Sequence, residues 1–171
     1  AEPDASSGLD TLKQLAYRDL AGSRDFRAAL EQLAPRLDYD ARFAQVLAER
    51  PLSLGYYFIP QGYGDARTGL LPQPSLPAAA FDPLQPGTPP PTGYGANLAA
   101  FQQAAQGAGF FNMQADADGT ARQMALVSPF GGGYHLALSA STLRVAFGGD
   151  PVTAGIDSAR LLGRQYRSPW I

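Results

Sequence analysis

The sequence predicts an α/β fold in which helices pack on a mixed sheet, with an α+β arrangement as the alternative. Two observations lead to this prediction. Apolar residues recur at three- and four-residue spacing in the N-terminal part, and the later segments follow in the order strand, loop, helix, hairpin, helix, strand. A chain of 171 residues suits one domain with a sizeable core, so we predict a single domain over residues 1–171.

Two helices are expected at the N-terminal end. Apolar residues between Leu9 and Leu20 keep a helical period until Gly22 interrupts it. Ser23 is a favourable N-cap for a second helix, which we expect to end at Pro35 because proline lacks the backbone donor. The two segments together predict a helical pair.

A third helix and a strand follow. Asp38 or Asp40 is expected to cap the helix, and Pro51 ends it. Residues 52–59 are aromatic-rich and bounded by prolines, which is typical of a strand. Residues 60–95 show no sustained period, so we predict one long Pro/Gly-rich loop that is functional or mobile, with mobility as the default.

The second half is expected to contain a hairpin. Asn97 should cap a helix, after which residues 109–113 and 120–127 read as strands joined at Asp118-Gly119. Arg122 could then pair with Asp116 or Asp118.

Beyond this hairpin, the three glycines 131–133 are expected to connect a strand to a helix over residues 134–147. Residues 151–156 could form an edge strand, and no helix or strand is predicted for residues 157–171.

Composition excludes several classes of function. The net charge is −2 without a basic run, so no nucleic-acid partner is expected. The chain has no cysteine and one histidine, which excludes thiol catalysis and a multi-histidine metal site, and we predict no metal or cofactor. No apolar run approaches the ~18 residues of a membrane span. Both ends look like cuts inside a larger protein.

Candidate catalytic groups each have a structural explanation. His135 could act as a general base with Ser139, but no nucleophile motif accompanies them, so a partly exposed histidine near a helix start is favoured. The carboxylate pairs Asp38/Asp40 and Asp116/Asp118 occupy positions where caps and turns favour aspartate. No catalytic residue is therefore predicted.

Two ion-binding interpretations are also weak. A calcium loop around Asp118-Gly119 would place Gln114 and Ala125 at ligand positions 1 and 12, where carboxylates are required, so a turn is favoured. Glycines 131–133 lack the lysine and hydroxyl of a phosphate loop.

The best binding candidates are aromatic. Tyr56, Tyr57 and Tyr63, together with Phe58, lie where the strand enters the long loop, and they could line a ligand pocket or a partner surface. Core packing is the alternative for each of them. The Pro-rich stretch 83–91 could be a polyproline ligand or an extended surface connector.

Four short segments have a characteristic order and spacing. They are Ala1-Glu2-Pro3-Asp4 with Ser6-Ser7; Leu37-Asp38-Tyr39-Asp40 with Phe43-Ala44; Gly109-Phe110-Phe111-Asn112 with Asp116, Asp118, Gly119 and Arg122; and Tyr134 before an Ala/Leu-rich helix. Together they resemble the second CHASE family, the extracellular sensory domains associated with cyclases and histidine kinases. The family's opening and C-terminal strands are expected to be absent here. In this picture Asn112, Asp116, Asp118, Gly119 and Arg122 have a structural role in the hairpin.

The resemblance implies the extracytoplasmic sensor of a bacterial membrane-anchored signalling protein. It would detect an unknown small-molecule or protein stimulus, with a homodimer as the expected assembly, and regulate a nucleotide cyclase, diguanylate cyclase or kinase through the parent's transmembrane helices. Two other classes stay open: a periplasmic hydrolase using His135 and a carboxylate, and an interaction module that docks a partner through residues 60–95.

Overall fold

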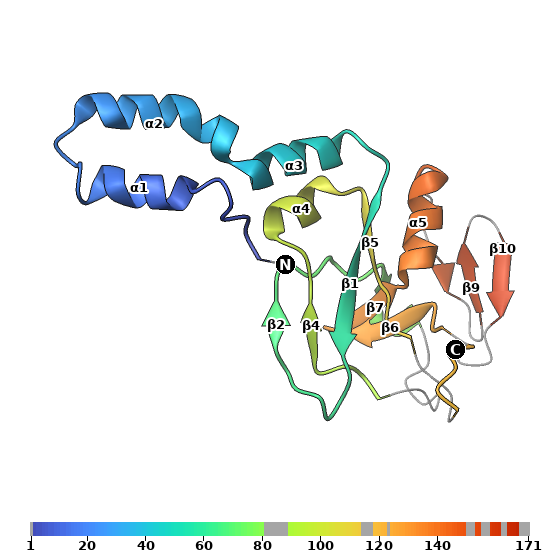
Figure 1. Cartoon of the computed structure of the whole chain (residues 1–171). Coiled ribbons are helices and arrows are strands. Elements are labelled where there is room, and N and C mark those ends of the chain that lie inside the picture. Colours follow the sequence, from blue (N-terminus) through green and yellow to red (C-terminus); the bar gives the residue numbers. More distant parts are fainter. Residues whose placement is uncertain are drawn as a thin grey trace.

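The structure is a computed structural model. It describes residues 2–80, 89–113, 118–122 and 124–149, and the backbone of 153–154, 158–161 and 164–167. Figure 1 shows a helical arm at the N-terminal end and a body in which strands and helices are combined. The predicted α/β class with a mixed sheet is confirmed.

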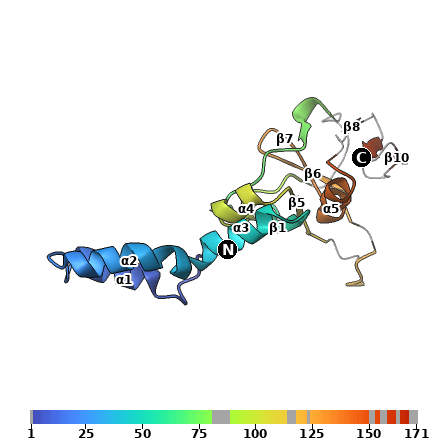
Figure 2. The same cartoon turned by 90° about the horizontal axis from the view of Figure 1, so that it is seen from above.

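The arm consists of α1 (Leu9–Tyr17) and α2 (Arg24–Leu37), which lie side by side in both views (Figures 1 and 2). Their seam buries Leu9, Ala16 and Leu30. As predicted, Ser23 caps α2: its hydroxyl accepts the N–H of Phe26 at 3.4 Å.

Pro35 does not end α2, so that prediction is wrong. The proline lies in the last turn, where it removes a single hydrogen bond, and the Asp38 N–H still bonds to the carbonyl of Ala34 at 2.9 Å. Asp38 then caps α3 (Tyr39–Ala48), because its carboxylate accepts the N–H of Ala41 at 2.9 Å.

The central sheet has four strands in the order β2-β4-β1-β5. β1 (Ser53–Ile59), which the sequence predicted, pairs antiparallel with β4 (Gly93–Gly95) and parallel with β5 (Gly107–Phe110). β2 (Arg67–Thr68) lies parallel to β4 at the edge.

α4 (Ala99–Ala104) precedes β5. Asn97 makes no cap for this helix, contrary to the prediction; its side-chain amide instead donates to the carbonyl of Gly55 at 3.1 Å.

A second sheet has the order β3-β7-β6. It contains β3 (Leu76–Pro77), which the short η1 (Ala78–Ala80) follows, β6 (Val127–Phe130) and β7 (Gly133–Leu136). An isolated parallel bridge joins Phe110, at the end of β5, to Ala137, which directly follows β7.

α5 (Leu138–Ala146) begins directly after this bridge and packs on β5 at Gly109, where a Cβ would lie 2.5 Å from the Cα of Leu138.

Three further strands lie near the C-terminal end of the chain. They are β8 (Thr153–Ala154), β9 (Ser158–Leu161) and β10 (Arg164–Arg167), and they form an antiparallel sheet in the order β10-β9-β8. β8 falls within the edge strand expected at 151–156, whose other residues lie outside the described part. β9 and β10 occupy a segment in which no element was predicted from periodicity, and strands are therefore present at the end of the chain where C-terminal strands were expected to be absent.

The long loop predicted at residues 60–95 is interrupted by short regular elements among the residues that the structure describes. They contain β2, β3, η1 and β4, and β4 lies inside the central sheet. These elements are only two or three residues long, which is too short for an alternating pattern to show in the sequence. Residues 81–88, including most of the Pro-rich stretch, lie outside the described part of the chain.

The predicted hairpin between residues 109–113 and 120–127 is also wrong. β5 pairs with β1, whereas β6 pairs with β7 through a two-residue turn. Gly131 and Gly132 form that turn with φ of 60° and 83°, as a type I′ hairpin turn requires. The helix expected from residue 134 therefore starts at Leu138, because residues 133–136 are β7.

Candidate functional site

The centre of the body is a buried pair of polar side chains. Tyr56 on β1 and His135 on β7 are 1% and 2% exposed, and the Tyr56 hydroxyl lies 3.1 Å from Nδ1 of His135. Burial lowers the pKa of His135 to about 4 and raises the pKa of Tyr56. At neutral pH both side chains are therefore uncharged, as their apolar surroundings require.

Aromatic rings surround this pair. The ring of Phe58 lies 5.4 Å from those of Tyr56 and His135, and 5.2 Å from that of Phe130 on β6. Tyr94 meets Phe130 edge-on at 5.5 Å. Such contacts add stability beyond the burial of apolar area. One aromatic cluster thus joins β1 and β4 of the central sheet to the β6–β7 hairpin.

His135 does not have the surroundings that a general base needs. It lies on a buried strand, whereas Ser139 is on α5, so the expected helix-face pair and the partly exposed histidine are both wrong. Its Nδ1 is within hydrogen-bond distance of the phenol of Tyr56. We therefore interpret His135 as a neutral residue of the core.

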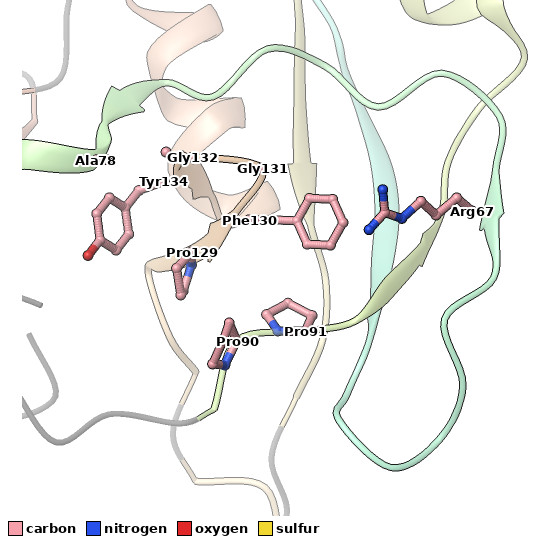
Figure 3. Close-up of a pocket in the computed structure, with 10 residues that line it drawn as sticks. Arg67, Ala78, Pro90, Pro91, Pro129, Phe130, Gly131, Gly132 and Tyr134 are labelled. Carbon is pink, nitrogen blue, oxygen red and sulfur yellow. The ribbon is translucent and has the colours of Figure 1, made fainter.

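A cavity of about 420 Å³ borders the aromatic cluster at Phe130. Its lining residues come from β2, η1, the segment before β4 and the β6–β7 hairpin: Arg67, Ala78, Pro90, Pro91, Pro129, Phe130, Gly131, Gly132, Gly133 and Tyr134. Figure 3 shows the guanidinium of Arg67 directed at the ring of Phe130, with the rings of Pro90 and Pro91 nearby. The Arg67 Cζ lies 5.4 Å from the centroid of the Phe130 ring, a cation–π distance.

The structure does not bring the three tyrosines of the predicted site together. Tyr56 lies in the core, whereas Tyr57 points to the opposite side of β1, is 46% exposed and packs near Phe111. Tyr63 follows the strand and is 83% exposed. Only Tyr56 belongs to the cluster beneath the cavity, and a ligand-binding role for the three stays a prediction.

Asn112 does not lie in the hairpin where a structural role was expected for it; its side chain contacts β1 instead. Its side-chain oxygen accepts the N–H of Phe58, and its side-chain nitrogen donates to the carbonyl of Phe58, both at 2.7 Å. The amide thus pairs with β1 as a neighbouring strand would, at the point where β5 has already ended.

The Asp118–Arg122 pair is exposed. Arg122 donates two hydrogen bonds to the carboxylate of Asp118, at 3.0 and 2.8 Å, and the Thr120 N–H donates a third at 3.0 Å. These bonds lower the pKa of Asp118 to about 2, with Arg122 as the main cause. Gly119 has a φ of 80°, the left-handed conformation expected of this turn. Asp116 and Gln114 lie outside the described residues.

The remaining candidates make structural contacts or form no site. Asp38 caps α3, and Asp40 accepts the backbone N–H of Asp4 at 2.9 Å. Glycines 131–133 do not precede a helix, so the anion-binding arrangement considered for them does not form. In the described part of the chain, no group of three or more acidic or histidine side chains gathers where it could hold a metal ion.

Sequence reasoning did not identify Arg67 or Phe130. Arg67 lies in the segment predicted to be an irregular loop, and a lone arginine between Gly64 and Gly69 gives no motif. Phe130 was missed because the hairpin was placed at the wrong residues. The Gly131-Gly132 pair between two apolar runs was the signal that could have located the cavity wall.

One of three comparisons with known proteins gives a match. Residues 2–167 match the sequence profile of the CHASE2 domain. The match includes all the residues that line the cavity and continues to the end of β10. No curated protein and no solved structure shows significant similarity to the chain. Among the described residues, no helix is long and apolar enough to cross a membrane.

Proposed function

Because the chain belongs to the CHASE2 family of sensory domains in signalling proteins, we propose that it is the extracytoplasmic sensor of a bacterial membrane-anchored protein. In this proposal the domain detects a stimulus outside the inner membrane, and the parent's transmembrane helices transmit the change to a cytoplasmic cyclase or kinase. The observation behind it is the family match over residues 2–167.

The packing of α5 supports a signalling role. α5 begins one residue after β7 and packs against β5 and β1. The hydroxyl of Ser141 on α5 lies 2.6 Å from that of Ser53 on β1. A Cβ at Gly109 would collide with the backbone of Leu138. Packed interfaces generally switch between discrete arrangements, so in this proposal a stimulus that favours a second arrangement of α5 shifts the population.

In the proposed mechanism, the domain acts within a homodimer of the parent protein. A stimulus of unknown chemistry changes the relation between the β6–β7 hairpin and α5, and the dimer converts this change into a different output. The alternative of a periplasmic hydrolase is not favoured, because His135 is buried and its Nδ1 lies against a neutral phenol.

The experiment is a comparison of output in the full-length parent, reconstituted in membranes. Gly109→Ala forces α5 away from β5, whereas a Cβ at Gly22 on the arm would meet no atom within 4 Å, so Gly22→Ala is a matched control. We expect Gly109→Ala to change cyclic-nucleotide or phosphoryl-transfer output severalfold at equal membrane content, and Gly22→Ala to leave it unchanged. Equal output from the wild type and both variants would contradict the proposal.

A further inference from the structure

The cavity beside the aromatic cluster has the dimensions of a small-molecule site. Its volume is about 420 Å³, within the ~300–1,000 Å³ that ligand pockets usually occupy. Separate stretches of the chain supply its walls, and they meet there only because β2, η1 and the β6–β7 hairpin fold together. The cavity therefore depends on the tertiary structure and is not formed by a single loop.

The walls favour a flat apolar body. Pro90, Pro91, Pro129 and Phe130 contribute rings, whereas the ring of Tyr134 is directed away from Arg67 (Figure 3). Proline and aromatic rings present broad faces against which a planar hydrocarbon can stack, with little loss of side-chain entropy because these residues have few rotatable bonds.

One charged side chain lines the cavity among the described residues, that of Arg67. In the described part of the chain, no carboxylate lies within 4.0 Å of its guanidinium. Its contact with the face of Phe130 leaves the guanidinium N–H groups available to oxygen acceptors. A guanidinium binds a planar carboxylate through two parallel hydrogen bonds, and a single arginine matches a single negative charge.

A ligand in the cavity would touch the part of the fold that leads to α5. Phe130 contacts the rings of Phe58, Tyr94 and His135, and Gly131-Gly132 connects β6 to β7. β7 continues through Ala137 into α5. Occupation of the cavity can therefore bias the position of this helix through directly packed groups.

We propose that the cavity between Arg67 and the β6–β7 hairpin binds a small aromatic monocarboxylate, whose carboxylate pairs with Arg67 while its ring packs against the rings of Pro90, Pro91 and Pro129. This inference rests on the proposed sensory function and gives its stimulus a chemical class.

The test is an NMR titration of the isotope-labelled 171-residue chain with phenylacetate and with its neutral analogue phenylacetamide. We expect saturable shifts of the amides of residues 130–134 with phenylacetate and at least about ten-fold weaker binding of the neutral analogue. Arg67→Met should weaken phenylacetate binding by about ten-fold or more, because it keeps the apolar stem and removes the charge. Arg18→Met, at an exposed arginine on the arm, is the matched control and should bind as the wild type does.

A second variant keeps the test independent of Arg67. Ala78→Trp fills the cavity from the wall that η1 forms and should also abolish the shifts. The absence of saturable shifts at residues 130–134 up to about 1 mM would overturn the site, as would equal binding of acid and amide that Arg67→Met leaves unchanged. Those results would leave the sensory role intact, because that role is tested separately by the output of the membrane-bound parent.

Discussion

The side-chain amide of Asn112 binds both backbone groups of Phe58, accepting its N–H and donating to its carbonyl at 2.7 Å each. Phe58 is 3% exposed and contacts Tyr56, Phe130 and His135 through its ring. The amide therefore holds β1 in place beside the aromatic cluster, beyond the end of β5.

We expect Asn112→Ala to destabilise the domain by about 1–3 kcal/mol, because both polar groups of the Phe58 backbone lose their partner in a partly buried site. Urea denaturation followed by tryptophan or tyrosine fluorescence measures the change. Asn97→Ala is a graded control, since Asn97 makes one such bond, to the carbonyl of Gly55. The account would be contradicted if Asn112→Ala lowered the free energy of unfolding no more than Asn97→Ala does.

Stability should depend on pH through His135. The folded-state pKa is about 4 and the reference value is 6.5, so between these values the unfolded chain binds a proton that the folded chain excludes. The free energy of unfolding is then unaffected by this group above pH 6.5 and falls as the pH drops from 6.5 to 4, by about 3 kcal/mol in total.

His135→Phe keeps an aromatic ring in the cluster and removes the titration. Denaturation midpoints of the wild type and this variant at a series of pH values test the prediction. The wild type should lose stability between pH 6.5 and 4 more steeply than the variant, and parallel curves would show that His135 is not the group responsible.

Gly119→Val should lower the melting temperature. Gly119 has a φ of 80°, and a Cβ at this position would meet no atom within 4 Å, so the cost is backbone strain alone, about 1–2 kcal/mol for a β-branched residue. Gly119→Asn is the matched control, because asparagine tolerates this conformation, and it should lower the melting temperature less. An unchanged melting temperature for the valine variant would contradict the turn geometry.

Gly109→Ala should destabilise the packing of α5 by about 1–3 kcal/mol, since its Cβ would lie 2.5 Å from the Cα of Leu138 and the backbone must move. Gly22→Ala should leave the free energy of unfolding almost unchanged, because nothing lies within 4 Å of its Cβ. Thermal denaturation of both variants tests this prediction. Similar midpoints for the two variants would show that α5 is not tightly packed on β5.

The parts of the fold that local sequence determines were predictable. Ser23 and Asp38 cap helices through bonds to residues three positions on, and the alternating burial of β1 reflects its own aromatic pattern. The pairing of β2 with β4 and of β5 with β1 joins distant segments, and no local pattern indicates it.

The candidate site was less predictable for the same reason. Asp118-Gly119 and Gly131-Gly132 are both hairpin signals, and only the strand partners decide which of them closes a hairpin. Once β6–β7 is in place, His135 becomes a core residue and Phe130 becomes a cavity wall. The position of Arg67 across from Phe130 depends on β2, a strand of two residues.

The most direct test of the extracytoplasmic sensor is the side of the membrane on which this chain lies. The chain has no cysteine, and Tyr63 is 83% exposed, so Tyr63→Cys in the full-length parent gives one accessible thiol in this region. Ala137→Cys, at a position 0% exposed, controls for accessibility, and the parent without either substitution controls for thiols elsewhere.

Intact cells are treated with a maleimide that crosses the outer membrane but not the inner one. We predict that Tyr63→Cys is labelled in intact cells and that Ala137→Cys is labelled only after denaturation. Labelling of Tyr63→Cys only after the inner membrane is broken would contradict an extracytoplasmic location.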